Sequence, residues 1–246
     1  LFLAERDGAA VVLHPKAAIV ATGAYERPRI VPGWTLPGVM TTGAAQTLWR
    51  SYRTLPGRRV LIAGSGPLNL QVALELAEGG AEVAAVAEVA PSPFLHPFAA
   101  LGLALAGPRL WARGARMVAG LRRRGIPVLN RTELVAIEPQ GVALRARLRD
   151  AGGQERAFEV DAMLTNEGFE PQNEVLRLLG AAMDPDPVFG HLRARRGETL
   201  ETTVPGLWAV GDCAGLGGPP PPRATPRFSS AASAADKRHG SVHDLF

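Results

Sequence analysis

The stretch 60–88 constrains the fold of this chain more than any other. An apolar run over residues 60–64 leads into a glycine turn. The next residues place apolar side chains at helical spacing, and Gly79 and Gly80 supply a stop signal. A second apolar run, residues 81–88, ends in an acidic residue. Two buried strands joined through a helix are typical of a parallel sheet, so the stretch predicts a βαβ unit.

The glycine turn of this unit has the residue pattern of a dinucleotide site. Gly64 permits a tight turn out of the strand, and Gly66 leaves the backbone open to a pyrophosphate. The following helix would offer its free N–H groups and its positive dipole end to the phosphates. Asn69 stands where the third glycine of the pattern is usual. A βαβ unit whose glycines serve only a turn is the alternative reading. The predicted nucleotide-binding residues are Gly64, Ser65, Gly66, Pro67, Leu68 and Glu88.

Glu88 bears on the choice of nucleotide. It ends the second strand, where a carboxylate accepts hydrogen bonds from a ribose diol. Its charge would repel a 2′-phosphate, so NAD is preferred over NADP. A solvated carboxylate at a strand end is the competing interpretation, and NADP or ATP stays an alternative at this site.

Composition excludes several classes of protein. The chain has 246 residues, 46% of them apolar, which is enough for a sizeable core. Its net charge is +4, but the arginines are scattered and no aromatic residues interleave with the cluster 122–124. We therefore expect no nucleic-acid partner. Cys213 is the only cysteine, which excludes a disulfide or dithiol mechanism within this chain. The histidines show no metal-ligand spacing, so no metal site is expected.

No segment has the order of a signal peptide. The apolar run 94–110 is interrupted by histidine, proline and glycine, and is too short to span a membrane. We expect a soluble, cytoplasmic protein without a membrane span.

The rest of the chain alternates short strands with helices. We expect an ordered loop over residues 25–40, and three short antiparallel strands lie within 134–160. The further strands are expected at 1–5, 9–13, 16–23, 127–129, 162–165 and 206–212, and the further helices at 41–52, 111–124 and 173–179.

Three motifs occur in a set order, and together they resemble the glutathione-reductase-like superfamily of flavoproteins. They are Ala21-Thr22-Gly23, the glycine turn at Gly64, and Gly211-Asp212. The resemblance implies an α/β fold: a Rossmann-like NAD(P)-binding domain, with a three-stranded antiparallel meander inserted in its parallel sheet, sits within a partial FAD-binding domain. It implies that FAD is bound by Ala21, Thr22, Gly23, Gly211 and Asp212, with Asp212 on the ribityl chain.

The resemblance also sets domain boundaries. It implies that residues 1–56 begin the FAD-binding domain, that 57–165 form the NAD(P)-binding domain, and that 166–216 return to the first. Residues 217–246, with four successive prolines, are expected to form a disordered tail.

A closer resemblance rests on the motifs at 21–28, 32–39, 43–46 and 166–173. These look like the FAD/NAD-binding subunits of opine oxidase, hydrogen cyanide synthase and sarcosine oxidase type amine dehydrogenases. The resemblance implies a heteromeric enzyme that oxidises a C–N bond of an amino acid, opine or secondary amine, with electrons passing through flavin and a second subunit sharing the catalysis. A non-catalytic nucleotide-binding or assembly subunit is the alternative.

The chain departs from this family at both ends. The family's first GxGxxG motif, which holds the FAD adenosine, would lie before Leu1, and prolines follow Gly217 where the family continues into a helix. We therefore expect a fragment, and a truncated relic is a further alternative.

Individual residues give no catalytic assignment. Cys213 has no neighbouring base and is interpreted as an inert small residue. Tyr25, Glu26 and Arg27 suit an ion pair or a hinge between domains better than a catalytic role.

Overall fold

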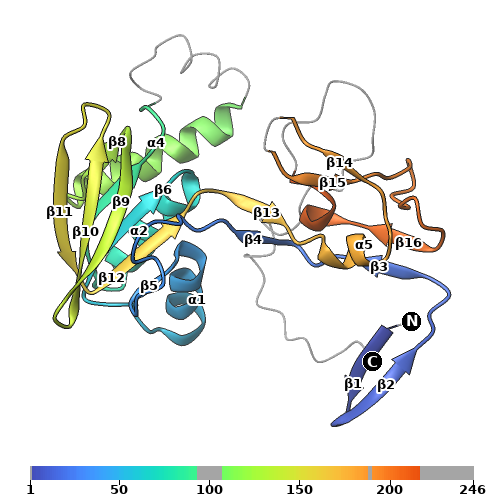
Figure 1. Cartoon of the computed structure of the whole chain (residues 1–246). Helices are drawn as coiled ribbons and strands as arrows, with labels where there is room; N and C mark the ends of the chain where they lie inside the picture. Colours follow the sequence, from blue (N-terminus) through green and yellow to red (C-terminus); the bar gives the residue numbers. More distant parts are fainter. Residues whose placement is uncertain (1, 93–106, 188–189, 217–246) are drawn as a thin grey trace. The chain divides into compact units, whose positions relative to one another are not determined.

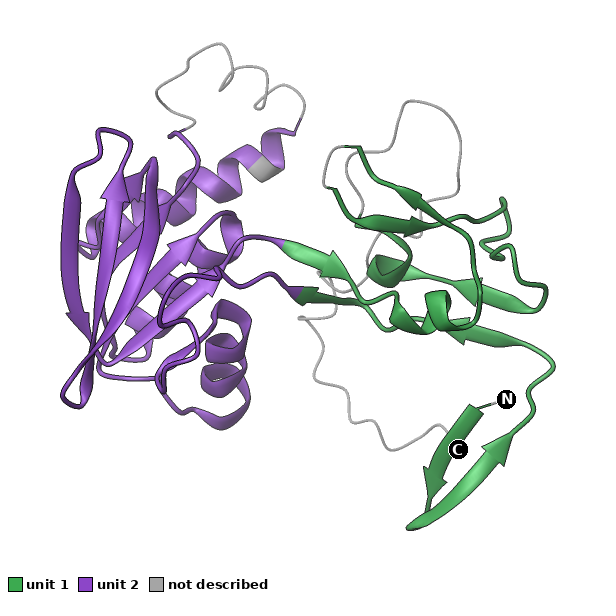
Figure 2. Cartoon of the chain, viewed as in Figure 1, with its two compact units in different colours: residues 1–25, 169–246 green, residues 26–168 purple. Residues whose placement is uncertain are grey.

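A computed structural model describes residues 2–92, 107–187 and 190–216. The chain forms two compact units (Figure 2): residues 26–168 make one, and residues 1–25 with 169–246 make the other. Each unit is described by itself below. We call them the inner unit and the outer unit, because the sequence of the first lies within that of the second.

The inner unit is built on a five-stranded sheet whose strands all run parallel (Figure 1). This confirms the predicted α/β class and the parallel sheet. In spatial order the strands are β5 (Val39–Thr41), β12 (Ala162–Asn166), β6 (Arg59–Gly64), β7 (Glu82–Glu88) and β8 (Val128–Asn130).

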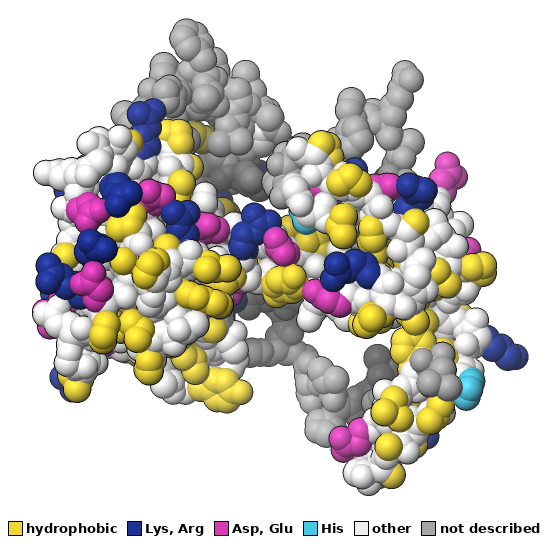
Figure 3. Space-filling view, in the orientation of Figure 1, with side chains coloured by type: hydrophobic (Ala, Val, Ile, Leu, Met, Phe, Trp, Pro, Cys, Tyr) yellow, Lys and Arg dark blue, Asp and Glu magenta, His cyan; other side chains and the backbone are white. Residues whose placement is uncertain are grey.

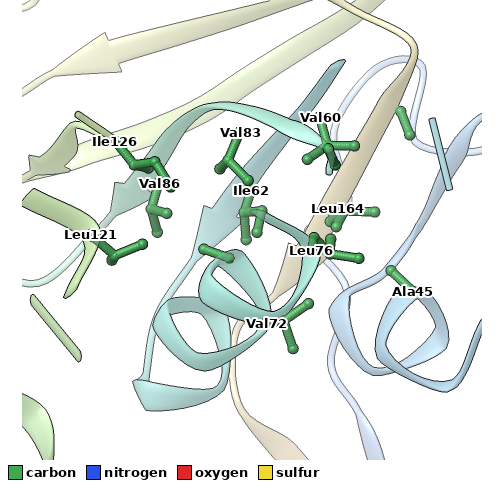
Figure 4. Packing of buried hydrophobic residues seen from close by; sticks show 13 residues of the cluster. Ala45, Val60, Ile62, Val72, Leu76, Val83, Val86, Leu121, Ile126 and Leu164 are labelled. Atoms are coloured by element: carbon green, nitrogen blue, oxygen red, sulfur yellow. The ribbon is translucent and has the colours of Figure 1, made fainter. Parts of the chain in front are cut away.

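Helices cover one face of this sheet. Val60 and Ile62 of β6 point toward them and pack with Val72 and Leu76, as Figure 4 shows. These side chains are fully buried, and alternation along the strand sends Leu61 to the opposite face. A strand buried on both faces has to be apolar throughout, which is why residues 60–63 form an unbroken apolar run. Among the residues that the structure describes, the helices of the inner unit are α1 (Thr42–Tyr52), α2 (Pro67–Glu78) and α4 (Pro108–Arg123).

A three-stranded antiparallel meander covers the other face, as predicted. Its inward side chains, among them Leu134, Leu144 and Leu148, join the core that contains Leu61. Its outward side chains are charged: Arg147 lies 3.1 Å from Glu138, and further ion pairs follow along the strands. Figure 3 shows these basic and acidic groups interspersed. The strands are β9 (Thr132–Gln140), β10 (Ala143–Asp150) and β11 (Glu155–Val160).

The outer unit consists of short elements around a small core that includes Leu176, Leu207 and Cys213. Strands β3 and β16 pair in parallel, and the other strand pairs in the described part of this unit are β1–β2, β14–β15 and β4–β13. The elements are β1 (Phe2–Arg6), β2 (Ala9–Leu13), β3 (Ala18–Val20), β4 (Ala24–Glu26), β13 (Phe169–Pro171), α5 (Glu174–Leu178), β14 (Met183–Pro185), β15 (Leu192–Ala194), β16 (Leu207–Ala209) and the 3-10 helix η2 (Gly211–Ala214).

Several boundaries differ from the sequence-based expectation. The segment 25–40, expected as a loop, contributes to β4 and β5, whose partners β13 and β12 lie far along the chain. Helix α4 begins at Pro108 instead of residue 111, because proline suits the first turn of a helix. The last strand ends at Ala209, so Asp212 lies in η2 and not at a strand end.

Two expectations fall largely outside the described residues, namely most of the apolar run 94–110 and the tail 217–246. Among the residues that are described, no helix is long and apolar enough to cross a membrane.

The inner unit is wider than the predicted NAD(P)-binding segment 57–165, because β5 pairs with β12 and α1 packs against α2. The assignment of a nucleotide to each domain segment remains a prediction.

Candidate functional site

The turn between β6 and α2 has the geometry that a pyrophosphate requires. Gly66 adopts a φ of 116°, and a Cβ built on it would meet no atom within 4 Å. Gly66 also caps α2 without any side-chain hydrogen bond, and Pro67 occupies the first turn. The backbone here is therefore open at a helix N-terminus, where N–H groups and the helix dipole favour an anion. These residues fit a dinucleotide phosphate.

Gly64 serves a second purpose besides the turn that its motif suggests. A Cβ at this position would collide with the backbone carbonyl of Asn166, the last residue of β12. The same carbonyl accepts the Ser65 N–H at 2.8 Å. Gly64 is thus needed for the close packing of β6 on β12 as well as for its positive φ of 144°.

Glu88 lies beside the turn. Its Oε2 accepts the N–H of Gly66 at 3.0 Å, and its Oε1 accepts the N–H of Ala90 at 3.2 Å. A carboxylate has about four acceptor positions, so it retains capacity for a ribose hydroxyl. The structure therefore brings the acidic residue and the glycine turn together, and the role of Glu88 at a ribose stays a prediction.

Asn69 has a structural role that its place in the motif did not indicate. It is 1% exposed, and its Oδ1 accepts the hydroxyl of Thr42 at 2.9 Å. Its Nδ2 donates to the Asn166 carbonyl at 3.1 Å. Where the usual glycine would let α2 approach the sheet, Asn69 instead links α2 to β12 and to α1. Asn69 lies one helical turn before the buried Ala73, and this spacing was the available signal.

The residues predicted to bind FAD lie in the outer unit and follow two adjacent strands in the sequence. Val20 of β3 pairs with Ala209 of β16, so the motifs that follow these strands are brought side by side. The Thr22 hydroxyl donates to the Gln172 carbonyl at 2.6 Å, and the Gln172 N–H donates to the Gly23 carbonyl at 2.9 Å. Thr22 and Gly23 therefore tie the segment that follows β3 to the segment that follows β13, 150 positions further along the chain.

The second motif of this group forms η2. Gly211 has a φ of 71°, and Asp212 is partly exposed in the turn that follows. The assignment of Ala21, Gly23 and Asp212 to FAD remains a prediction.

Cys213 is inaccessible. Its exposure is 0%, and its Sγ lies 3.3 Å from the Val20 carbonyl and 3.2 Å from the Val210 carbonyl. Arg196 lies nearby, and partial desolvation lowers the pKa of its guanidinium. The thiol packs in the core of the outer unit, which agrees with its interpretation as a small structural residue.

The nucleotide-type turn, the parallel sheet and the paired β3 and β16 motifs define a dinucleotide-dependent oxidoreductase fold. The chain belongs to the pyridine nucleotide-disulphide oxidoreductase family, whose sequence profile matches residues 3–237. This confirms the predicted resemblance, and FAD and NAD(P) are the cofactors of that family.

Individual relatives show which members of this family the chain resembles. An opine oxidase subunit of Agrobacterium tumefaciens (strain Ach5) is 31% identical over 93% of this chain and 45% of its own length. Hydrogen cyanide synthase subunit HcnB of Pseudomonas aeruginosa is 33% identical over 81% of this chain and 44% of its own length. The chain thus spans less than half of the curated relatives it matches.

A solved structure shares the fold. The flavoprotein disulfide reductase RclA from Escherichia coli superposes with a TM-score of 0.62 at 21% identity, covering 87% of this chain and 43% of RclA. At this identity the likeness concerns the fold alone.

Proposed function

We propose that this chain is the FAD- and NAD-binding part of an oxidoreductase subunit that oxidises the C–N bond of an amino acid, an opine or a secondary amine. The nucleotide-binding part of this proposal rests on the open space at Gly66 beside Glu88. The substrate class is supported by the likeness to the opine oxidase subunit. A bound flavin would accept the electrons released when the C–N bond is oxidised.

The residues of this chain would hold the cofactors without doing the bond chemistry themselves. At the glycine turn, Gly66 would leave room for the pyrophosphate, the backbone at Leu68 would hold it, and Glu88 would bind the ribose. In the outer unit, Thr22 and Asp212 would orient the flavin. A second, catalytic subunit in a cytoplasmic hetero-oligomer is part of the proposal, since the relatives are named as subunits.

The test uses the full-length protein, purified with and without its partner subunit. Its absorption spectrum is recorded, NADH and NADPH are titrated, and turnover of octopine and of sarcosine is followed with an artificial electron acceptor. Flavin bands, NADH binding and bleaching of the flavin by one of these amines are the expected results.

Two outcomes would count against the proposal. Flavin bands that no amine bleaches, with nucleotide binding intact, would favour the alternative of a nucleotide-binding assembly subunit. Absence of both flavin and nucleotide binding would remove the proposal altogether.

A further inference from the structure

A connected network of buried polar side chains lies where β12 and β6 end. Thr42 is 0% exposed, and Asn69 and Asn166 are each 1% exposed. Buried polar groups cost stability unless each is hydrogen-bonded, and a satisfied network fixes one arrangement of the groups it joins. The network therefore sets the geometry at this edge of the sheet.

Glu26 anchors the network. Its Oε1 accepts the N–H of Gly43 at 2.7 Å, and its Oε2 accepts Nδ2 of Asn166 at 2.6 Å. Gly43 lies in the first turn of α1, where the helix dipole favours a negative charge. A Cβ on Gly43 would collide with the Glu26 carboxylate, so glycine permits this approach.

Asn166 transmits this anchoring to the glycine turn. Its Oδ1 accepts the N–H of Gly168 at 2.9 Å, so its side-chain amide is held by donors and acceptors on both atoms. Its backbone carbonyl accepts two donors, the Ser65 N–H at 2.8 Å and Nδ2 of Asn69 at 3.1 Å. Ser65 precedes the open Gly66 directly. A short chain of contacts thus runs from Glu26 to the turn.

We propose that Glu26 is a positioning residue for the nucleotide site, acting through Asn166 and not on the ligand. The inference rests on the proposed nucleotide binding at Gly66. Its physical basis is that the phosphate-facing N–H groups bind well only when the turn is preorganised, and the turn is fixed to the Asn166 carbonyl.

The pair can be tested by exchanging donor and acceptor. In Glu26→Gln, the amide can adopt two orientations. In one, its NH₂ group faces Nδ2 of Asn166, so two donors meet; in the other, its NH₂ group faces the Gly43 N–H, which then loses its acceptor. In Asn166→Asp, two carboxylates face one another. The double variant restores one donor and one acceptor with side chains of unchanged size, so a functional link predicts mutual rescue.

NADH affinity of the full-length protein is measured by calorimetric titration, and the thermal midpoint is recorded separately. We expect each single variant to weaken NADH binding about fivefold or more and the double variant to return to within about twofold of the wild type. Glu82→Gln, at the opposite end of the sheet on β7, is the matched control with unchanged affinity.

The outcomes separate this inference from the proposal beneath it. If the wild-type protein binds no NADH, the nucleotide-binding proposal itself is overturned. Wild-type binding with unchanged affinity in Glu26→Gln, or single-variant losses that simply add in the double variant, overturns the positioning role. A lower thermal midpoint with unchanged affinity would assign Glu26 to stability alone and also overturns it.

If Glu26→Gln does not fold, Gly43→Ala tests the same contact. The added methyl displaces the Glu26 carboxylate while every charge is kept. Weaker NADH binding supports the role, and unchanged binding overturns it.

Discussion

The carbonyl of Asn166 occupies the space that any side chain on Gly64 would need. The two residues are register partners across β12 and β6, and the same carbonyl binds the Ser65 N–H. The two motif glycines therefore have separable roles: Gly64 packs one strand on another, whereas Gly66 faces open space.

Gly64→Ala should destabilise the inner unit severely. The new methyl collides with backbone and not with a flexible side chain, so relief requires β6 and β12 to separate. We expect a loss of about 3 kcal/mol or more in the free energy of unfolding, measured by urea denaturation. A loss below about 1 kcal/mol would mean that the strands shift easily.

Gly66→Ala should impair binding more than folding. At a φ of 116° alanine is strained by about 1 kcal/mol, and its methyl enters the space left for a phosphate. NADH affinity should fall about tenfold or more.

Gly80→Ala is the matched control for this variant. Gly80 also has a positive φ, 97°, and open surroundings, but it lies beyond the far end of α2. Gly80→Ala should lose about as much stability as Gly66→Ala and should bind NADH with the affinity of the wild type. Equal affinity losses in the two variants would show that strain, and not the site, is being measured.

Glu88→Arg should shift nucleotide preference. The wild-type carboxylate repels a 2′-phosphate, whereas a guanidinium attracts it. The ratio of NADPH to NADH affinity should rise about tenfold, as measured by paired titrations. Glu78→Arg, on the exposed end of α2, serves as the control for added charge. An unchanged ratio would mean that Glu88 does not face the ribose.

Glu75 should contribute stability that depends on pH. Burial raises the pKa of its carboxyl, but hydrogen bonds from Arg50, Gln71 and Gln46 outweigh this, so the net pKa is lowered from 4.5. A carboxyl with a lowered pKa stabilises the folded state above its unfolded pKa, and this contribution is lost as pH falls through the folded value. Glu75→Gln should cost about 1 kcal/mol near neutral pH.

The variant should therefore show a smaller drop in unfolding free energy than the wild type between about pH 6 and about pH 3. Thermal or urea unfolding across this range gives the comparison. Parallel profiles for the two proteins would contradict the linkage.

The sequence predicted the βαβ unit and the meander because these depend on local patterns: apolar runs, a glycine turn and short hairpins. It did not predict β5, a three-residue strand that exists only because β12 lies beside it. The Asn69 link was equally hidden, since its partner Asn166 is 97 positions away. Contacts over such distances are set by the assembled sheet and leave no periodic trace in the sequence.

Glu26 illustrates the same limit within the candidate site. The charged residues around it suggested an ion pair or a hinge. Nothing in the neighbouring sequence indicates that its carboxylate reaches Gly43 and Asn166. The candidate nucleotide site could be predicted from the glycine turn, but the contacts that support the turn depend on the packing of α1 and β12.

Cys213 should be unreactive in the folded protein. Its thiol is fully buried and lies within hydrogen-bond distance of two backbone carbonyls, so reagents cannot reach it in the folded protein. Ellman's reagent should release no colour from the native protein and one equivalent after denaturation. Cys213→Ser should keep flavin and nucleotide binding at a cost of about 1 kcal/mol in stability. Rapid native labelling would place the thiol at an accessible surface and reopen a chemical role for the residue next to Asp212.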